Sequence, residues 1–187
     1  MNMTRKLFTT LFIIPIQPDK NMQSTTRQLT LCAMLAALAL ALSYIEGMFP
    51  LPVPLPGIKP GLANIVTVYA LYALGARSAL AILLVRVLLG AMFAGNASAL
   101  MYSLLGGFAA MLAMILLRRI DKLSIYGVSI GGAAAHNCGQ VAAAVLTLGS
   151  AAPLAYLPIL LIAAVLSGSL TGLIAALLFR AMPRGRT

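Results

Sequence analysis

Three ionisable side chains, Glu46, Arg86 and His136, lie within long apolar segments of this sequence. Burying such groups among apolar residues is costly, so they are usually paired or functional. Arg86 could bind an anionic group of a ligand. Glu46 and His136 are further candidates for a binding site. A structural alternative stays open, in which Glu46 and Arg86 form a buried ion pair and a neighbouring helix satisfies His136.

Uncharged polar side chains of the same segments gather toward one end of them. They are Asn64, Asn96, Tyr102, Asn137 and Gln140. The other end is mostly Ala, Leu, Ile and Gly. Together with the three ionisable groups, and with Lys59 of a proline-rich segment, these residues predict a cup that binds a small polar molecule.

The sequence offers little for catalytic or metal chemistry. It has only three acidic residues, Asp19, Glu46 and Asp121, which argues against an aspartate-rich Mg²⁺ clamp for a diphosphate. It has no Walker A motif for ATP, and its two cysteines, Cys32 and Cys138, match no metal-binding spacing. We therefore expect a binding or transport subunit with no catalytic residue, no metal and no cofactor.

The elements that must hold these residues are membrane-spanning helices. Hydrophobic residues make up 61% of the 187 residues and charged residues 9%, against about 25% charged residues in soluble domains. A chain this apolar cannot cover itself with a polar surface. At about 20 residues for each crossing, the pattern predicts an all-α membrane protein of about six transmembrane helices. The predicted spans are 30–48, 62–74, 78–94, 97–117, 126–148 and 154–181.

The basic residues predict how these spans are oriented. Of the 13 basic residues, all except Lys59 and Arg86 fall on one side of a six-span topology. The positive-inside rule makes that side cytoplasmic, which puts both termini in the cytoplasm and the protein in the cytoplasmic (inner) membrane. The net charge of +10 is spread between apolar segments. This spacing predicts a lipid bilayer as the partner and no nucleic acid.

The same pattern divides the chain into three regions. Residues 1–26 form an N-terminal tail, within which Met22 offers an alternative start. Residues 27–182 form the six-helix transmembrane domain, and residues 183–187 form a basic C-terminal tail. Five prolines between Pro50 and Pro60 exclude a helix and predict an extended loop between the first two spans.

Small residues recur at every fourth position in three of the predicted helices. In lipid, such stripes let helices approach closely. The stripe of 126–148 includes Gly139, and the stripe of 154–181 includes Gly168 and Gly172; both are expected to pack within the chain. The stripe of the first helix could equally pack internally or dock a partner subunit. It consists of Ala33, Ala37 and Ala41.

Four segments of the sequence resemble a known family. They are Arg27-Gln28-Leu29-Thr30, Pro56-Gly57-Ile58-Lys59-Pro60-Gly61-Leu62-Ala63-Asn64-Ile65, Val85-Arg86-Val87-Leu88-Leu89-Gly90 and Ser103-Leu104-Leu105-Gly106-Gly107. They look like the Gx transporter family, also labelled heptaprenyl diphosphate synthase component I. That family is similar to the substrate-binding S components of energy-coupling factor (ECF) transporters. The resemblance covers about residues 24 to 182.

The resemblance implies a subunit that binds a vitamin or similar micronutrient from outside, under the loop after the first helix. The alanine stripe of the first helix would dock onto a transmembrane coupling subunit that is driven by two ATPases. The substrate cup would include Asn64, Arg86, Asn96, Tyr102 and His136. Two other roles stay open: a membrane accessory subunit of polyprenyl diphosphate or quinone synthesis, and a stand-alone facilitator.

Overall fold

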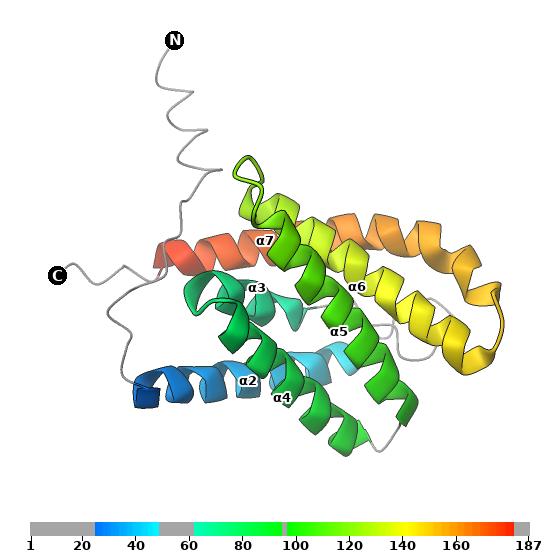
Figure 1. The fold of residues 1–187 in the computed structure, drawn as a ribbon, viewed down its shortest axis with the longest axis horizontal. Coiled ribbons are helices and arrows are strands. Elements are labelled where there is room, and N and C mark those ends of the chain that lie inside the picture. The colour runs from blue at the N-terminus through cyan, green and yellow to red at the C-terminus, as the bar shows by residue number, and fades with distance from the viewer. Residues whose placement is uncertain (1–24, 49–61, 95–96, 182–187) are drawn as a thin grey trace, which may run out of the picture.

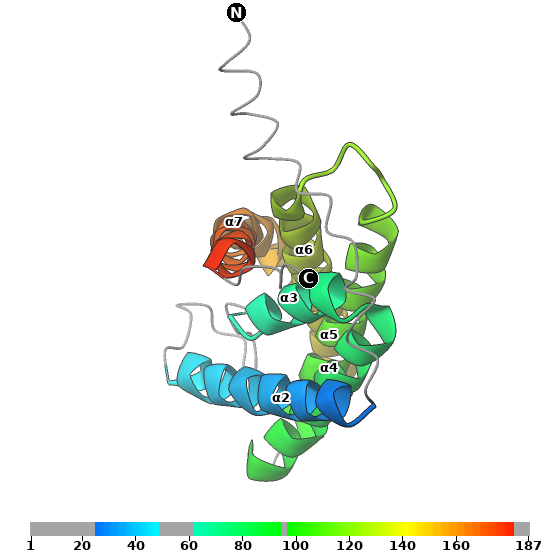
Figure 2. The ribbon, with the colours of Figure 1, turned by 90° about the vertical axis from the view of Figure 1, so that its left-hand side faces the viewer.

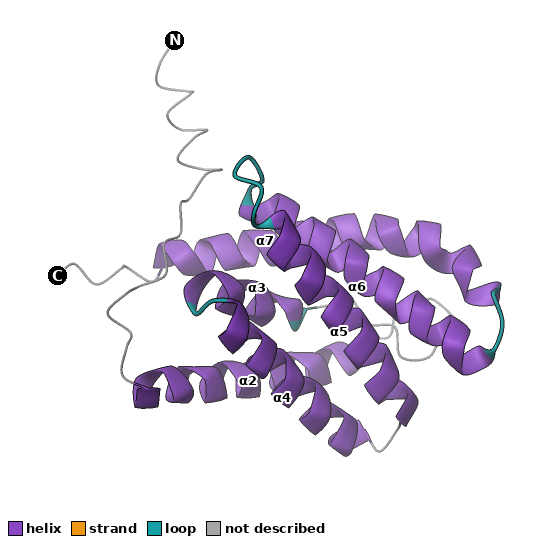
Figure 3. Cartoon of the chain, viewed as in Figure 1, coloured by secondary structure: helices purple, strands orange, loops and turns teal. Residues whose placement is uncertain are grey.

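The structure, a computed structural model, describes residues 25–48, 62–94 and 97–181 of the chain. Every regular element in these ranges is a helix (Figures 1 and 3). The elements are α2 (Thr25–Gly47), α3 (Asn64–Ala73), α4 (Ala76–Ala94), α5 (Ala97–Leu117), α6 (Ile125–Leu148), the 3₁₀ helix η1 (Ala152–Tyr156) and α7 (Leu157–Ala181).

These helices confirm the all-α prediction and match the predicted spans within a few residues. The largest difference is at α2, which begins at Thr25 rather than at residue 30. The added turn is polar, and the Thr30 hydroxyl donates to the carbonyl of Thr26 within it. Hydropathy marks where a helix meets lipid, whereas the helix itself continues into the polar region.

Local signals set the ends of the other helices. Gly75 adopts φ 89°, a left-handed conformation that favours glycine, and its N–H donates to the carbonyl of Ala70 to close α3. Ser124 caps α6, because its hydroxyl accepts from the N–H of Gly127. Gly149, at φ 61°, ends α6 in the same left-handed region.

The helices pack as two groups joined by α3 and α4. On one side α6 lies between α5 and α7, and on the other α2 packs against α4 and α3. Figures 1 and 2 show α2 on the opposite side of the molecule from α6 and α7. The ten-residue helix α3 lies between α2 and the pair α6 and α7, and it contacts α2, α4 and α7.

Glycines bring α5, α6 and α7 into backbone contact, as the sequence predicted. A Cβ placed on Gly139 of α6 would lie 2.5 Å from the carbonyl oxygen of Leu105 in α5. A Cβ on Gly168 of α7 would lie 2.6 Å from the Cα of Ile130 in α6. Both distances are too short for any side chain, so the small-residue stripes of α6 and α7 serve packing within the chain.

The stripe of α2 has the opposite surroundings. Ala33, Ala37 and Ala41 are all exposed, whereas Ala36 and Ala39 on the other face are buried. No described residue therefore covers the α2 stripe. Of the two roles left open by the sequence, packing within the chain does not occur in the described part of the molecule.

Four of the helical segments are long and apolar enough to cross a membrane: Thr26–Gly47, Ala76–Phe93, Ala97–Leu117 and Ala152–Ala181. The fifth long helix, α6, carries His136, Asn137 and Gln140 near its middle, and these polar residues lower its mean hydropathy. The short helix α3 is apolar but has only ten residues. A multi-pass membrane protein follows, while the count of six spans stays a prediction.

One end of the bundle, here called the basic end, carries the described positive charges outside the helices. Arg118, just after α5, donates to the carbonyl of Leu71 at 2.5 Å and lies over the ring of Tyr72, 4.8 Å from its centroid. Tyr72 in turn contacts Phe179 of α7. The ends of α3, α5 and α7 therefore meet at one level, as an alternating topology requires. The cytoplasmic position of the termini stays a prediction, since residues 1–24 and 182–187 lie outside the described ranges.

Candidate functional site

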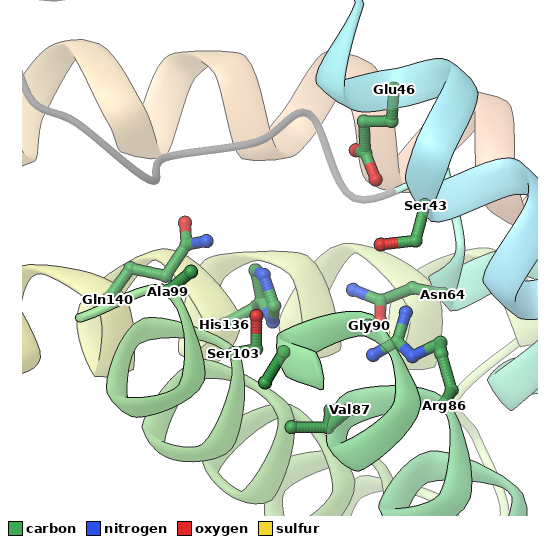
Figure 4. A pocket seen from close by; sticks show the side chains of 11 residues that line it. Ser43, Glu46, Asn64, Arg86, Val87, Gly90, Ala99, Ser103, His136 and Gln140 are labelled. Atoms are coloured by element: carbon green, nitrogen blue, oxygen red, sulfur yellow. The ribbon is translucent and has the colours of Figure 1, made fainter. Parts of the chain in front are cut away.

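A polar cavity lies between α2, α3, α4, α5 and α6, away from the basic end (Figure 4). Its volume is about 50 Å³, and a buried water needs roughly 10–15 Å³. The cavity therefore accepts a compact chemical group of a few atoms. It is lined by Ser43, Glu46, Asn64, Arg86, Val87, Gly90, Ala91, Ala99, Ser103, His136 and Gln140.

Of the Asp, Glu, Lys, Arg and His side chains in the described ranges, the buried ones are Glu46, Arg86 and His136. All three line this cavity. The charge of Arg86 interacts with Glu46 and with His136. The sequence identified these residues by the cost of burying them, and the structure brings them together at one place.

Glu46 lies in the last turn of α2 and connects two helices. One of its carboxylate oxygens accepts from the N–H of Leu62 at 2.8 Å, directly before α3. This bond holds the start of α3, with Asn64 in its first turn, against the end of α2. The two polar residues therefore face one cavity from helices that are separated by a proline-rich stretch of chain.

Arg86 lies about three turns into α4 and is 7% exposed. Gly90 is one turn further on the same face of α4, and Leu40 of α2 packs against it. A Cβ added at Gly90 would meet only Leu40, at 3.6 Å, so this glycine keeps open space at the cavity. The Nε of Arg86 has no hydrogen-bond partner among the described residues.

His136 and Gln140 are one turn apart on α6 and pack against Gly106 of α5. A Cβ added to Gly106 would lie 2.9 Å from Cγ of Gln140 and 3.0 Å from Cε1 of His136. Gly106 therefore sets how deeply both side chains sit between the helices. His136 is 7% exposed, and its Nδ1 lacks a hydrogen-bond partner within the described chain.

Of the nine residues predicted for the binding cup, the structure brings five together at the cavity: Glu46, Asn64, Arg86, His136 and Gln140. Two others lie outside its lining. The amide of Asn137 donates to the carbonyl of Leu160 at 2.6 Å and ties α6 to α7. The Tyr102 hydroxyl shares a hydrogen bond with that of Thr147 at 3.2 Å, between α5 and α6. Lys59 and Asn96 are outside the described residues.

Ser43 and Ser103 line the cavity but were not predicted to do so. Serine is common in membrane helices, so its type alone gives no signal. Spacing could have identified both residues. Ser43 precedes Glu46 by three positions on α2, and Ser103 precedes Gly106 by three positions on α5, which puts each pair on one helix face.

The opposite half of the bundle is less purely apolar than the sequence suggested. Ser129 of α6 and Thr171 of α7 are buried there, beside the glycine contacts of the two helices. The hydroxyl of Thr171 donates to the carbonyl of Ser167 in its own helix. The hydroxyl of Ser129 has no hydrogen-bond partner among the described residues. Both hydroxyls are small, and they add no charge.

In the described ranges no group of three His, Cys, Asp or Glu residues is placed to hold a metal ion. What the cavity offers is one carboxylate, one guanidinium, one imidazole, two amides and two hydroxyls. Such a set can recognise a small polar molecule by hydrogen bonds and charge.

The fold and the cavity define a class: a multi-pass membrane protein built around a buried polar site. A family model described as heptaprenyl diphosphate synthase component I matches residues 35–178. The match extends over most of the chain, so the protein belongs to this family.

A solved structure described as the "Structure and mechanism of the S component of a bacterial ECF transporter" has a similar fold. The TM-score is 0.56, the sequence identity is 19%, and the match covers 84% of this chain and 94% of the other. A comparison with curated proteins found no match. The resemblance drawn from the sequence is confirmed, and the low identity limits the structural likeness to the fold.

Proposed function

We propose that this chain is the substrate-binding S component of an ECF-type, ATP-driven importer of a micronutrient in the cytoplasmic membrane. Family membership and the S-component fold support the proposal. The observation that carries it is the arrangement of α2, which has a cavity-lining face and an uncovered alanine face.

The two faces of α2 point in opposite directions. Glu46 and Ala37 are nine residues apart, which at about 100° for each residue sets them about 180° apart around the helix. Glu46 is 3% exposed and lines the cavity, whereas Ala37 is exposed. A change on the cavity side of α2 would therefore reach the surface directly opposite.

The alanine face suits a helical partner. Ala33, Ala37 and Ala41 present no side chain larger than a methyl, so a second helix can approach the backbone closely. The chain has no Walker A motif, so the energy of transport would come from partner chains. We assign the docking surface to a transmembrane coupling subunit that carries two ATPases.

In this mechanism the subunit captures its substrate at the cavity from outside the cell. Contacts between the substrate and Glu46 or Ser43 stabilise α2 against α3 and α4. ATP hydrolysis on the partners then reorients the loaded subunit so that the cavity opens toward the cytoplasm. The subunit itself catalyses no reaction.

Replacing Ala37 by tryptophan tests the proposal, because a bulky side chain would hold the partner helix away. The tagged A37W protein should fold, remain monodisperse and still bind its ligand. It should fail to co-purify with ATPase subunits and fail to support uptake. The measurement is quantitative mass spectrometry of the purified complex, with ATPase content compared to that of the wild-type protein.

Ala142→Trp is the matched control, since Ala142 is an exposed alanine on α6. It should keep the ATPase subunits at the wild-type level. Equal loss of ATPases from both variants would mean that the α2 stripe is not a docking surface. Wild-type protein that never co-purifies with an ATPase would reject the importer role altogether.

The family description favours a second candidate, an accessory subunit for polyprenyl diphosphate synthesis. The same purification separates the candidates, because the accessory role predicts a soluble prenyl synthase in place of ATPases. The small number of acidic residues argues that any such synthase activity belongs to the partner. A stand-alone facilitator would purify with neither.

A further inference from the structure

Two buried hydrogen-bonding atoms at the cavity have no partner in the described chain: Nε of Arg86 and Nδ1 of His136. Each side chain is more than nine-tenths buried, and each lines the cavity from a different helix. Buried polar atoms are satisfied in the great majority of cases, so a pair of unsatisfied ones facing one cavity indicates a ligand. Nε of Arg86 can only donate, and Nδ1 of His136 donates in the tautomer that carries its proton there, so the matching ligand group is an oxygen acceptor that lies between α4 and α6.

Arginine narrows the choice of acceptor. Its Nε and a terminal nitrogen form a planar fork that fits the two oxygens of a carboxylate. A doubly charged phosphate at the same place would face one guanidinium and, across the cavity, the carboxylate of Glu46. A singly charged carboxylate is therefore the better match to the charges of the site.

The charge balance adds a second requirement. Among the described residues that line the cavity, Glu46 and Arg86 are the buried charged pair, and together they contribute no net charge. A ligand with a carboxylate alone would leave one buried negative charge without compensation, which is costly. A ligand that also carries a cationic group keeps the site neutral and presents that group to Glu46. Figure 4 shows Ser43 and Asn64 close to these two residues, with His136, Ser103 and Gln140 further along the cavity.

We propose that the cavity between Arg86, His136 and Glu46 binds the head group of a small zwitterion, with its carboxylate at Arg86 and His136 and its ammonium at Glu46. The inference rests on the proposed substrate-binding function and names the class of substrate. The cavity volume of about 50 Å³ fits such a head group.

Four small molecules of nearly equal size test the class directly: L-alanine as the zwitterion, propionate as the anion, isopropylamine as the cation and propionamide as the neutral analogue. Binding of each to the purified full-length protein is measured by ligand-observed NMR and by competition between them. L-Alanine should bind at least about tenfold more tightly than the other three, because only it satisfies both charged ends.

A charge-preserving variant, Arg86→Lys, checks the role of the guanidinium fork. It keeps the partner of Glu46, so the fold should persist, while L-alanine binding should weaken by about tenfold as the bidentate contact is lost. Arg77→Lys makes the same change at an exposed arginine of the same helix and should leave binding unchanged. If Arg86→Lys does not fold, the comparison of the four molecules on the wild-type protein still tests whether the ligand is a zwitterion.

Propionate or propionamide binding as tightly as L-alanine would overturn the zwitterion class, and so would no detectable binding of L-alanine at millimolar concentration. These outcomes leave the proposed function standing if the protein co-purifies with ATPases. Loss of the ATPases with retained preference for L-alanine would reject the importer and keep the ligand class.

Discussion

The two sides of this bundle are held together in different ways. On the side of α5, α6 and α7, glycines bring helix backbones into contact, and Asn137 and Tyr102 add hydrogen bonds between helices. On the side of α2, one face packs against α4 and α3 through apolar residues and through the hydrogen bonds Gln28–Ser78 and Leu62–Glu46. The other face of α2 stays uncovered by any described residue.

The difference indicates that the two sides of the bundle have different roles. Glycines hold the backbones of α5, α6 and α7 in close contact. We therefore expect these helices to form a rigid wall for Ser103, His136 and Gln140. The α2 helix supplies Glu46 and Ser43 to the same cavity, but its uncovered face leaves it freer to respond to a partner. The cavity therefore lies between a rigid wall and a helix suited to movement.

A substitution that disrupts the packing of α5 against α6 should have the largest effect on stability. Gly139→Ala would push a Cβ to 2.5 Å from the Leu105 carbonyl oxygen and 2.9 Å from the Cα of Gly106. These are backbone atoms that cannot turn aside, so we expect a loss of about 3 kcal/mol or more, or no folded protein. Thermal unfolding in one detergent, with yield of monodisperse protein, measures the effect.

Gly131→Ala is the control on the same helix. Its new Cβ would meet the end of the Leu117 side chain, which can rotate away. Alanine also favours a helix over glycine by about 1 kcal/mol, so this change should be nearly neutral. Equal destabilisation by both variants would show that backbone contact is not what holds α5 and α6 together.

The helices of this fold were largely predictable, because a lipid bilayer strictly limits the structures that can cross it. Every backbone group in a bilayer must bond within its own segment, so an apolar run of sufficient length becomes a helix. The beginning of α2 was less predictable, since Thr25 to Arg27 are polar and helical at once. Hydropathy gives no information about which helix lies beside which, and contacts such as Asn137 to Leu160 follow only from the packing.

The sequence predicted which polar side chains of the candidate site are buried, but only partly which way these side chains point. Buried ionisable groups are costly, which identified Glu46, Arg86 and His136 from the sequence. His136 and Asn137 are neighbours, however, and point about 100° apart around α6. One lines the cavity and the other ties α6 to α7. Spacing does not separate the two, because Gln140 lies four positions from His136 and three from Asn137, so only the packing shows which side chain faces the cavity.

The contact between α5 and α6 meets the ligand site at Gly106. Variants at Gly106 and at the adjacent Gly107 test whether this contact positions His136. Gly106→Ala would place a Cβ 3.0 Å from Cε1 of His136 and displace the ring, so the protein should fold and bind L-alanine about tenfold more weakly. Gly107→Ala would meet only the end of Leu83, a flexible side chain of α4, and should leave binding unchanged. Titration by NMR measures both affinities, and unchanged binding in Gly106→Ala would remove His136 from the site.

The smallest effect is expected on the uncovered face of α2, and there a near-zero result is informative. Ala37 and Ala39 are two residues apart on one helix, the first exposed and the second fully buried in the core. Replacing either by leucine changes helix propensity little. Ala39→Leu should overpack the contact with the neighbouring helices and cost about 1–3 kcal/mol. Ala37→Leu should stay within about 0.5 kcal/mol of the wild-type protein, as exposed positions usually do.

Denaturation of both variants in the same detergent compares the two faces directly. Similar destabilisation by the two changes would mean that Ala37 also packs inside the chain, which would end the argument for an open docking face. A stable Ala37→Leu protein that loses part of its ATPase complement would support that argument more strongly than the tryptophan variant does. Leucine adds only a few carbons to an apolar surface, so a lost partner would then reflect the close helix approach that a stripe of alanines permits.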